Sequence, residues 1–213
     1  MPRFTVDAVL FDLDGTLVDS TASVYRNWRK IAAILGRDGE DIAGHLQGIP
    51  GRQALRIIEP GLSEQRIREL DEALIEFEIG DTSDVVPTKG AVGLLSALPS
   101  RRWGIVTSGT RRLAVARLTA AGLPRPSILV TADDVETGKP DPAPFRLAAA
   151  HIGHPPARCL AVEDAPAGIA SARAAGCRTV GVLTTYPSLD ADTVPDLTAL
   201  TIDVADGGLA VTY

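Results

Sequence analysis

The sequence VLFDLDGTLVDS, residues 9–20, decides the fold because it joins a short apolar run to two acids and a glycine. An apolar run bounded by a turn is typical of a strand covered on both faces, as in a parallel sheet. Such sheets bind ligands at the carboxyl ends of their strands, where Asp12 and Asp14 follow the run. Residues two apart in an extended chain point to one side, and two adjacent carboxylates stay ionised only beside a compensating cation. The stretch therefore indicates a site for a hard divalent cation.

Two other interpretations of this stretch are available. A calcium loop of the EF-hand kind needs a third oxygen ligand, a glycine at its sixth position and a terminal Glu, which the residues after Gly15 do not supply. The acids could also cap a helix that begins near Asp19 or Ser20. The stretch alone does not decide between a cap and a functional site, and the rest of the chain has to do so.

Composition indicates one compact α/β unit. The 213 residues suffice for one substantial core and a small inserted domain, and the net charge of -6 offers no basic stripe for nucleic acid. The sequence shows neither a signal peptide nor an uncharged run of membrane-spanning length, so we expect a cytoplasmic protein that does not bind membranes. A monomer is expected, with a weak dimer as the alternative. Cys159 and Cys177 lie in separate apolar runs and predict buried free thiols rather than a disulfide or a metal pair.

The spacing of apolar residues divides the chain into two patterns. Residues 20–87 show helical periodicity without strand signals, with helices expected over 20–35, 42–46, 53–58 and 64–77. Beyond residue 87 helices and strands alternate. Helices are expected over 91–98, 111–121, 144–152 and 168–175, and strands over 103–107, 128–131, 159–162 and 179–182. This alternation predicts a Rossmann-like, doubly wound parallel sheet, and the run 197–202 predicts a last helical turn or edge strand.

Four motifs follow the predicted strands in order: DLDGT at 12–16, TSG at 107–109, GKPDP at 138–142 and VEDAPAGI at 162–169. Together they resemble the motifs of the haloacid dehalogenase superfamily. Within it, the chain is similar to the sugar and polyol phosphatases with a helical cap, such as glycerol-phosphate and 2-deoxyglucose-6-phosphate phosphatases. The resemblance implies an α/β core of residues 1–19 and 88–213, with residues 20–87 inserted as an all-helical cap domain.

The resemblance also implies roles for the motif residues. Asp12 would be the nucleophile that forms an aspartyl-phosphate, and Asp14 would protonate the leaving alcohol and later deprotonate water. Asp12, Glu163 and Asp164 would bind Mg²⁺, together with the backbone carbonyl of Asp14. The residue pair at 163–164 alone is also explained by acids favoured at a helix N-terminus.

Two further motifs would hold the phosphate. Thr107 offers a hydroxyl and Ser108 and Gly109 offer backbone N–H groups at the start of a helix, although a simple N-cap is equally compatible with these residues. Lys139 would neutralise Asp12 and the phosphate, since the following proline fixes the local backbone.

The predicted cap contains the expected determinants of substrate choice. The segment 47–52, QGIPGR, resembles a substrate-specificity loop, in which Gln47 and Arg52 would contact the substrate. His45 is assigned a surface or capping role. Residues 87–90, PTKG, mark the return to the core, and the role of Lys89 stays open.

The resemblance predicts a Mg²⁺-dependent phosphatase acting on a small sugar or polyol phosphate. A β-phosphoglucomutase-type phosphomutase is the alternative, but those relatives carry a His near the position of Val24. Haloacid dehalogenases attack carbon and do not need the acid at Asp14. A non-catalytic phosphate-binding module has little support, because a competent residue fills every motif position.

Overall fold

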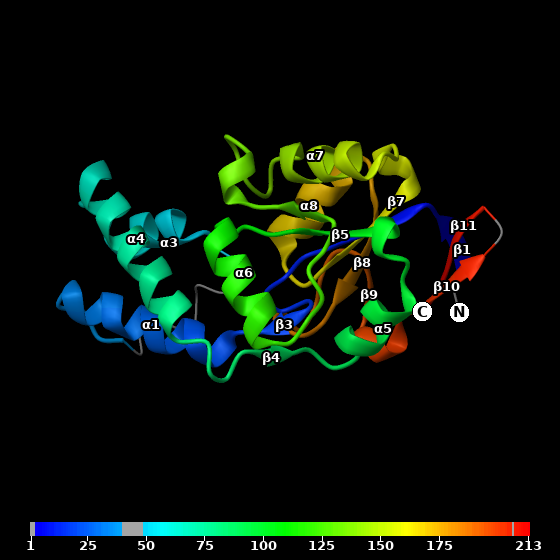
Figure 1. Cartoon of the computed structure of the whole chain (residues 1–213). Helices are drawn as coiled ribbons and strands as arrows, with labels where there is room; N and C mark the ends of the chain where they lie inside the picture. Colours follow the sequence, from blue (N-terminus) through cyan, green and yellow to red (C-terminus); the bar gives the residue numbers. More distant parts are fainter. Residues whose placement is uncertain (1–2, 40–48, 206) are drawn as a thin grey trace.

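A six-stranded parallel sheet forms the centre of the computed structural model, which describes residues 3–39, 49–205 and 207–213 (Figure 1). The strand order is β6-β5-β2-β7-β8-β9, and each neighbouring pair is parallel. The strands are β2 (Ala8–Phe11), β5 (Trp103–Val106), β6 (Ile128–Val130), β7 (Cys159–Glu163), β8 (Arg178–Val182) and β9 (Asp192–Val194). The strand β2 therefore lies between β5 and β7, which both precede motifs of their own, and the predicted doubly wound sheet is confirmed.

Helices cover both faces of this sheet because successive strand residues point to opposite sides. Leu10 packs in the apolar cluster with Phe145, whereas the adjacent Phe11 packs in the cluster with Leu118 on the other face. The core helices are α5 (Ala91–Ala97), α6 (Arg111–Ala120), α7 (Ala143–Ile152) and α8 (Pro166–Ala175). Short 3₁₀ helices connect the elements: η1 (Ser100–Arg102), η2 (Ala132–Asp134), η3 (Pro156–Arg158) and η4 (Leu197–Ala199). All four predicted core helices are confirmed to within two residues at each end.

A separate group of helices, at the left of Figure 1, forms the inserted cap. It contains α1 (Thr21–Ile34), α3 (Gly51–Ile58) and α4 (Glu64–Gly80), packed around a third apolar cluster that includes Trp28, Leu55 and Leu70. These helices confirm the predictions for 20–35, 53–58 and 64–77. The helix predicted over 42–46 lies outside the described residues.

The chain enters and leaves the cap through a pair of two-residue antiparallel strands, β3 (Val18–Asp19) and β4 (Val86–Pro87). The prediction that no strand occurs up to residue 87 is therefore wrong at its last two positions. Two residues are too few to show a strand periodicity, and pairing with a distant segment forms this strand.

The two ends of the chain meet in a three-stranded antiparallel sheet, ordered β1-β11-β10, at the right of Figure 1. Its strands are β1 (Arg3–Val6), β10 (Thr201–Ala205) and β11 (Gly208–Thr212). Both predicted alternatives occur in the run 197–202, because a 3₁₀ turn is followed there by the start of the edge strand β10. Strands β1, β9 and β11 were not predicted. The strand β9 has only three residues, and β1 and β11 pair with each other across nearly the whole chain, which leaves little local pattern.

Both cysteines are buried and free, as predicted. Burial raises the pKa of the Cys159 thiol to about 11 and that of Cys177 to about 12, which makes both thiols poor nucleophiles. Within the described part of the chain, no helix combines the length and apolar character needed to cross a bilayer.

Candidate active site

The carboxyl ends of β2, β5 and β7 bring the motif residues together. Asp12 follows β2, and Lys139 reaches it from the loop before α7, with 2.5 Å between Lys139 Nζ and Asp12 Oδ1. The same ammonium donates to Glu163 Oε1 at 2.6 Å and to the carbonyl oxygen of Val106 at 2.8 Å. Burial by itself would lower the pKa of Lys139, but the carboxylates of Asp12 and Glu163 raise it above its ordinary value. Lys139 is therefore a fixed positive charge.

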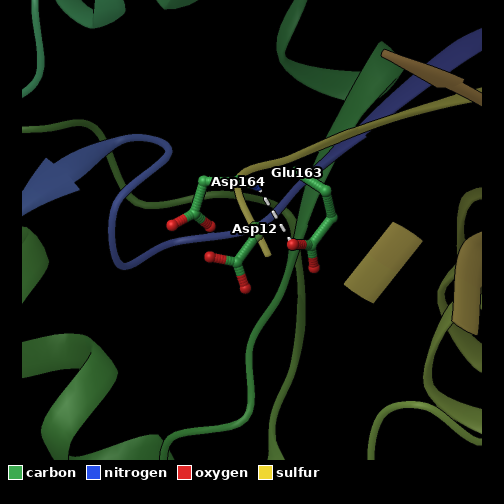
Figure 2. A group of neighbouring side chains, drawn as sticks. All are labelled: Asp12, Glu163 and Asp164. Atoms are coloured by element: carbon green, nitrogen blue, oxygen red, sulfur yellow. Dashed lines mark hydrogen bonds between the residues drawn. The ribbon is translucent and has the colours of Figure 1, made fainter. Parts of the chain in front are cut away.

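Three carboxylates meet at this edge of the sheet: Asp12, Glu163 and Asp164 (Figure 2). All are buried, and a ligand oxygen from each lies within 4.8 Å of the other two. The second oxygen of Glu163 accepts from the backbone N–H groups of Asp164, drawn as the dashed line in Figure 2, and of Ala165. The predicted convergence of residues from two distant motifs is thus present in the structure.

Two glycines allow the backbone to approach these carboxylates. A Cβ at Gly168, in the first turn of α8, would collide with the carboxylate of Glu163. A Cβ at Gly15 would collide with Asp164 and with the hydroxyl of Thr185, and Gly15 also has a φ of 84°. Side chains larger than hydrogen at these positions would displace the acids.

The charges in this cluster fit a divalent cation. Lys139 supplies one positive charge for three carboxylates, which leaves an excess of two negative charges when all three are ionised. Burial, together with the adjacent Glu163, raises the pKa of Asp164 from 3.8 to about 7. Burial also raises the pKa of Asp12, an effect that Lys139 opposes and the other two acids reinforce. Oxygen ligands around an excess of two charges suit Mg²⁺.

Asp14 is held by two partners, one at each carboxylate oxygen. Ser20 donates its hydroxyl to Oδ1 at 2.8 Å, and Arg117 contacts Oδ2 at 2.8 Å. Arg117 also contacts Oε2 of Glu78, on cap helix α4, at 3.1 Å. Burial, with the nearby charge of Asp14, raises the pKa of Glu78 to about 7 against the opposing charge of Arg117.

Arg117 and Glu78 were not predicted as site residues, although each is a charged residue on the apolar stripe of a helix. Arg117 follows Leu113 by four residues and precedes Leu118, so it lies on the apolar stripe of α6. Glu78 likewise follows Leu74 by four residues on the apolar stripe of α4. A charged residue on the buried stripe of a helix needs an oppositely charged or hydrogen-bonding partner. Its presence there therefore marks a candidate site.

The loop between β5 and α6, which contains the groups predicted to bind phosphate, lies beside the carboxylate cluster. Thr107 is buried and accepts at its hydroxyl from the backbone N–H of Gly109 at 3.1 Å. Thr110, rather than Thr107 or Ser108, occupies the N-cap position of α6. The Gly109 N–H is therefore engaged within the loop, and it would bind phosphate only by giving up the Thr107 hydroxyl.

These residues surround a cavity of about 150 Å³ between core and cap. Its core side contains the motif residues Asp12, Asp14, Thr107, Ser108, Gly109, Lys139, Glu163 and Asp164. Its cap side is mostly apolar and contains Val24, Trp28, Ile49, Pro50, Gly51, Leu74 and Glu78. A small ligand with polar and apolar faces would match these walls.

Arg52 and Lys89, the two cationic residues considered for substrate contact, each have a carboxylate partner. Arg52 is 58% exposed and pairs with Asp71 at 2.9 Å, and its side chain is not among those that line the cavity. Lys89 pairs with Asp196 at the surface. Gln47 and His45 lie outside the described residues.

Comparison with known proteins identifies the family. The sequence model of the haloacid dehalogenase-like hydrolases matches residues 6–176. The chain belongs to this family. The superfamily predicted from the four motifs is therefore confirmed.

The relatives of this haloacid dehalogenase-like hydrolase include named phosphatases. It is 42% identical over 175 residues to hexitol phosphatase A of Escherichia coli, covering 81% of either chain. It is 35% identical over 192 residues to glycerol-1-phosphate phosphohydrolase 2 of Saccharomyces cerevisiae, covering 85% of this chain and 76% of the relative. A solved hydrolase from Pseudomonas syringae is 31% identical with a TM-score of 0.75, covering 84% of this chain and 85% of that one.

Proposed function

We propose that this hydrolase is a Mg²⁺-dependent phosphatase that cleaves a small sugar or polyol phosphate monoester through an aspartyl-phosphate. The main support is the position of the buried Asp12 at one end of a small cavity, where Lys139 fixes it and two further acids flank it. The names of the hexitol and glycerol phosphate relatives support the substrate class. An apolar Val24 in the cavity wall offers no proton transfer group for a mutase.

Each residue of the site has a task in this reaction. The carboxylate of Asp12 attacks phosphorus, while Lys139 offsets its charge and that of the phosphoryl group. The Thr107 hydroxyl and the backbone N–H of Ser108 hold phosphoryl oxygens, and the N–H of Gly109 joins them when it exchanges the Thr107 hydroxyl for phosphate. Asp14 donates a proton to the leaving oxygen and then accepts one from the attacking water.

Metal binding and the cap complete the proposal. Asp12, Glu163, Asp164 and the backbone carbonyl of Asp14 would hold Mg²⁺, which when bound neutralises charge on the phosphoryl oxygens. We assign residues 20–87 to the cap, because the paired strands β3 and β4 mark both of its ends. Its apolar wall would exclude water and contact the carbon skeleton of the substrate.

Phosphate release tests the proposal. Wild type and Asp12→Asn are assayed with Mg²⁺ and with EDTA on hexitol, glycerol, hexose and pentose phosphates, including β-glucose 1-phosphate, and sugar-phosphate isomers are scored as well. We expect Mg²⁺-dependent release that Asp12→Asn abolishes, and a hydroxylamine-sensitive phosphoenzyme in acid-quenched wild type. The exposed Asp190→Asn is the matched control and retains activity. Isomerisation without release, or no turnover on the panel, overturns the proposal.

A further inference from the structure

One guanidinium joins the core and the cap inside the active site. Arg117 lies on α6, and only 6% of its side chain is exposed. Its Nη1 atom contacts Asp14 Oδ2 at 2.8 Å, and its Nη2 atom contacts Glu78 Oε2 at 3.1 Å. The two carboxylates belong to different parts of the molecule, since Asp14 follows β2 of the core and Glu78 lies near the end of cap helix α4. All three side chains line the cavity.

We infer that Arg117 is a positioning residue, which orients the Asp14 carboxylate for proton transfer and couples that orientation to the placement of cap helix α4. The inference rests on the proposed function, in which Asp14 moves protons. In this role Arg117 acts through Asp14 and does not itself contact the substrate.

The hydrogen-bond geometry supports a positioning role. With Ser20 on Oδ1 and Arg117 on Oδ2, both oxygens of Asp14 are held, so the side chain is restricted to one orientation. The planar guanidinium presents several N–H groups in fixed directions, and it can therefore serve two carboxylates at once. A lysine ammonium lacks this fork.

A second ion pair joins the same two helices at the surface. The buried pair of Arg117 and Glu78 is therefore not needed merely to hold α4 against α6. Arg112 of α6 contacts Glu76 of α4 at 2.7 Å, with 65% and 49% of these side chains exposed. Such a surface pair connects α4 to α6 with little loss of hydration. Burying Arg117 and Glu78 costs desolvation of both charges, and apolar residues of similar volume often stabilise as well. The distinguishing property of the buried pair is its contact with Asp14.

The chemistry predicts a specific signature for this role. In the first half-reaction, Asp12 forms a bond to phosphorus and the bond from phosphorus to the leaving oxygen breaks, while that oxygen takes the proton of Asp14. A polyol is a poor leaving group without this proton, whereas 4-nitrophenolate departs without it. A misplaced Asp14 should thus impair cleavage of an alkyl phosphate far more than cleavage of 4-nitrophenyl phosphate.

The test compares kcat/KM on these two substrates, because kcat/KM includes steps only up to leaving-group departure. The alkyl substrate is the phosphate ester that wild type hydrolyses best. We expect Arg117→Met to lose about 100-fold on the alkyl phosphate, a typical contribution of general acid catalysis, and less than about threefold on the aryl phosphate. Arg117→Lys should restore part of the loss, and Glu78→Gln should show a smaller loss of the same kind. Arg112→Met and Glu76→Gln are the matched controls and should leave both substrates unchanged.

Equal losses on both substrates, or no loss on either, would overturn the positioning role. Thermal unfolding checks each variant, and if Arg117→Met does not fold, Arg117→Lys and Glu78→Gln decide the question. Asp14→Asn separates this inference from the proposed function. If Asp14→Asn still hydrolyses the alkyl phosphate at the wild-type rate, the proton-transfer assignment fails; if it loses that activity while the Arg117 variants keep theirs, only the positioning role fails.

Discussion

Replacing Asp164 by asparagine should stabilise the metal-free protein at alkaline pH. Burial and the adjacent Glu163 raise the pKa of Asp164 from 3.8 to about 7 in the folded state. A pKa that is higher in the folded than in the unfolded state contributes stability at low pH. This contribution is complete below about pH 4 and is lost as the pH rises through about 7. The asparagine amide does not ionise, so the Asp164→Asn variant escapes this loss.

The size of the effect follows from the two pKa values. One pKa unit corresponds to about 1.4 kcal/mol, so the full loss approaches about 4 kcal/mol. Between pH 5 and pH 8, the free energy of unfolding of Asp164→Asn should rise by about 3 kcal/mol relative to that of wild type in EDTA. Mg²⁺ should offset most of this difference, because it binds the ionised form and adds about 2.7 kcal/mol to wild type at a concentration of 100 Kd.

Urea unfolding followed by circular dichroism at pH 5, 6, 7 and 8, in EDTA and in Mg²⁺, measures both effects. Asp190→Asn is the control, because its carboxylate is fully exposed and pairs only at the surface with Arg173. Its difference from wild type should not change with pH in this range. If the difference in unfolding free energy between Asp164→Asn and wild type does not change with pH, the raised pKa of folded Asp164 is refuted. If Mg²⁺ stabilises both proteins equally, Asp164 is not a ligand of the metal site.

Three further substitutions test other parts of the site. Lys139→Met should lower kcat by about 100-fold or more, because it removes the buried charge that faces Asp12, while the exposed Lys89→Met should not; equal rates would exclude the electrostatic role. Gly168→Ala should weaken Mg²⁺ binding by about 10-fold or more in a calorimetric titration, since its Cβ displaces Glu163, and unchanged affinity would show that Glu163 does not orient the metal site. Arg52→Ala should leave kcat/KM on the alkyl phosphate within about threefold, because Asp71 holds its guanidinium outside the cavity; a rise in KM on that substrate alone would instead support the substrate contact predicted from the sequence.

The parallel sheet was predictable because its central strands combine two signals. A strand such as β7 is apolar at successive positions and then ends in acids, so its burial and its chemistry appear side by side in the sequence. The convergence of Asp12 with Asp164 then follows from the topology of a doubly wound sheet. By contrast, β1 and β11 form an antiparallel sheet whose pairing joins the two ends of the chain. Such pairing depends on distant partners and leaves little local pattern.

The contact between Arg117 and Glu78 was harder to predict for a related reason. Motifs mark residues at strand ends, whereas Arg117 and Glu78 lie in the middle or near the end of helices and meet only when cap and core are assembled. Their positions on apolar stripes show that they are buried but not with whom. Arg52 shows a different limit: its residue type suits a substrate anion, but the sequence does not reveal that Asp71 lies within reach as a competing partner.

The paired strands β3 and β4 have a consequence for how this protein can diversify. Val18 lies opposite Pro87 and Asp19 opposite Val86, so the cap begins and ends at adjacent points of the backbone. Thr88 completes the junction, since its N–H donates to the carbonyl of Leu17 and its hydroxyl to that of Thr16. An insertion with neighbouring ends can be exchanged for another segment without changing the strand order of the core. Chimeras that join the insertion of one relative to the core of another at this junction should therefore fold, and new leaving-group preferences can evolve while the phosphoryl-transfer machinery is retained.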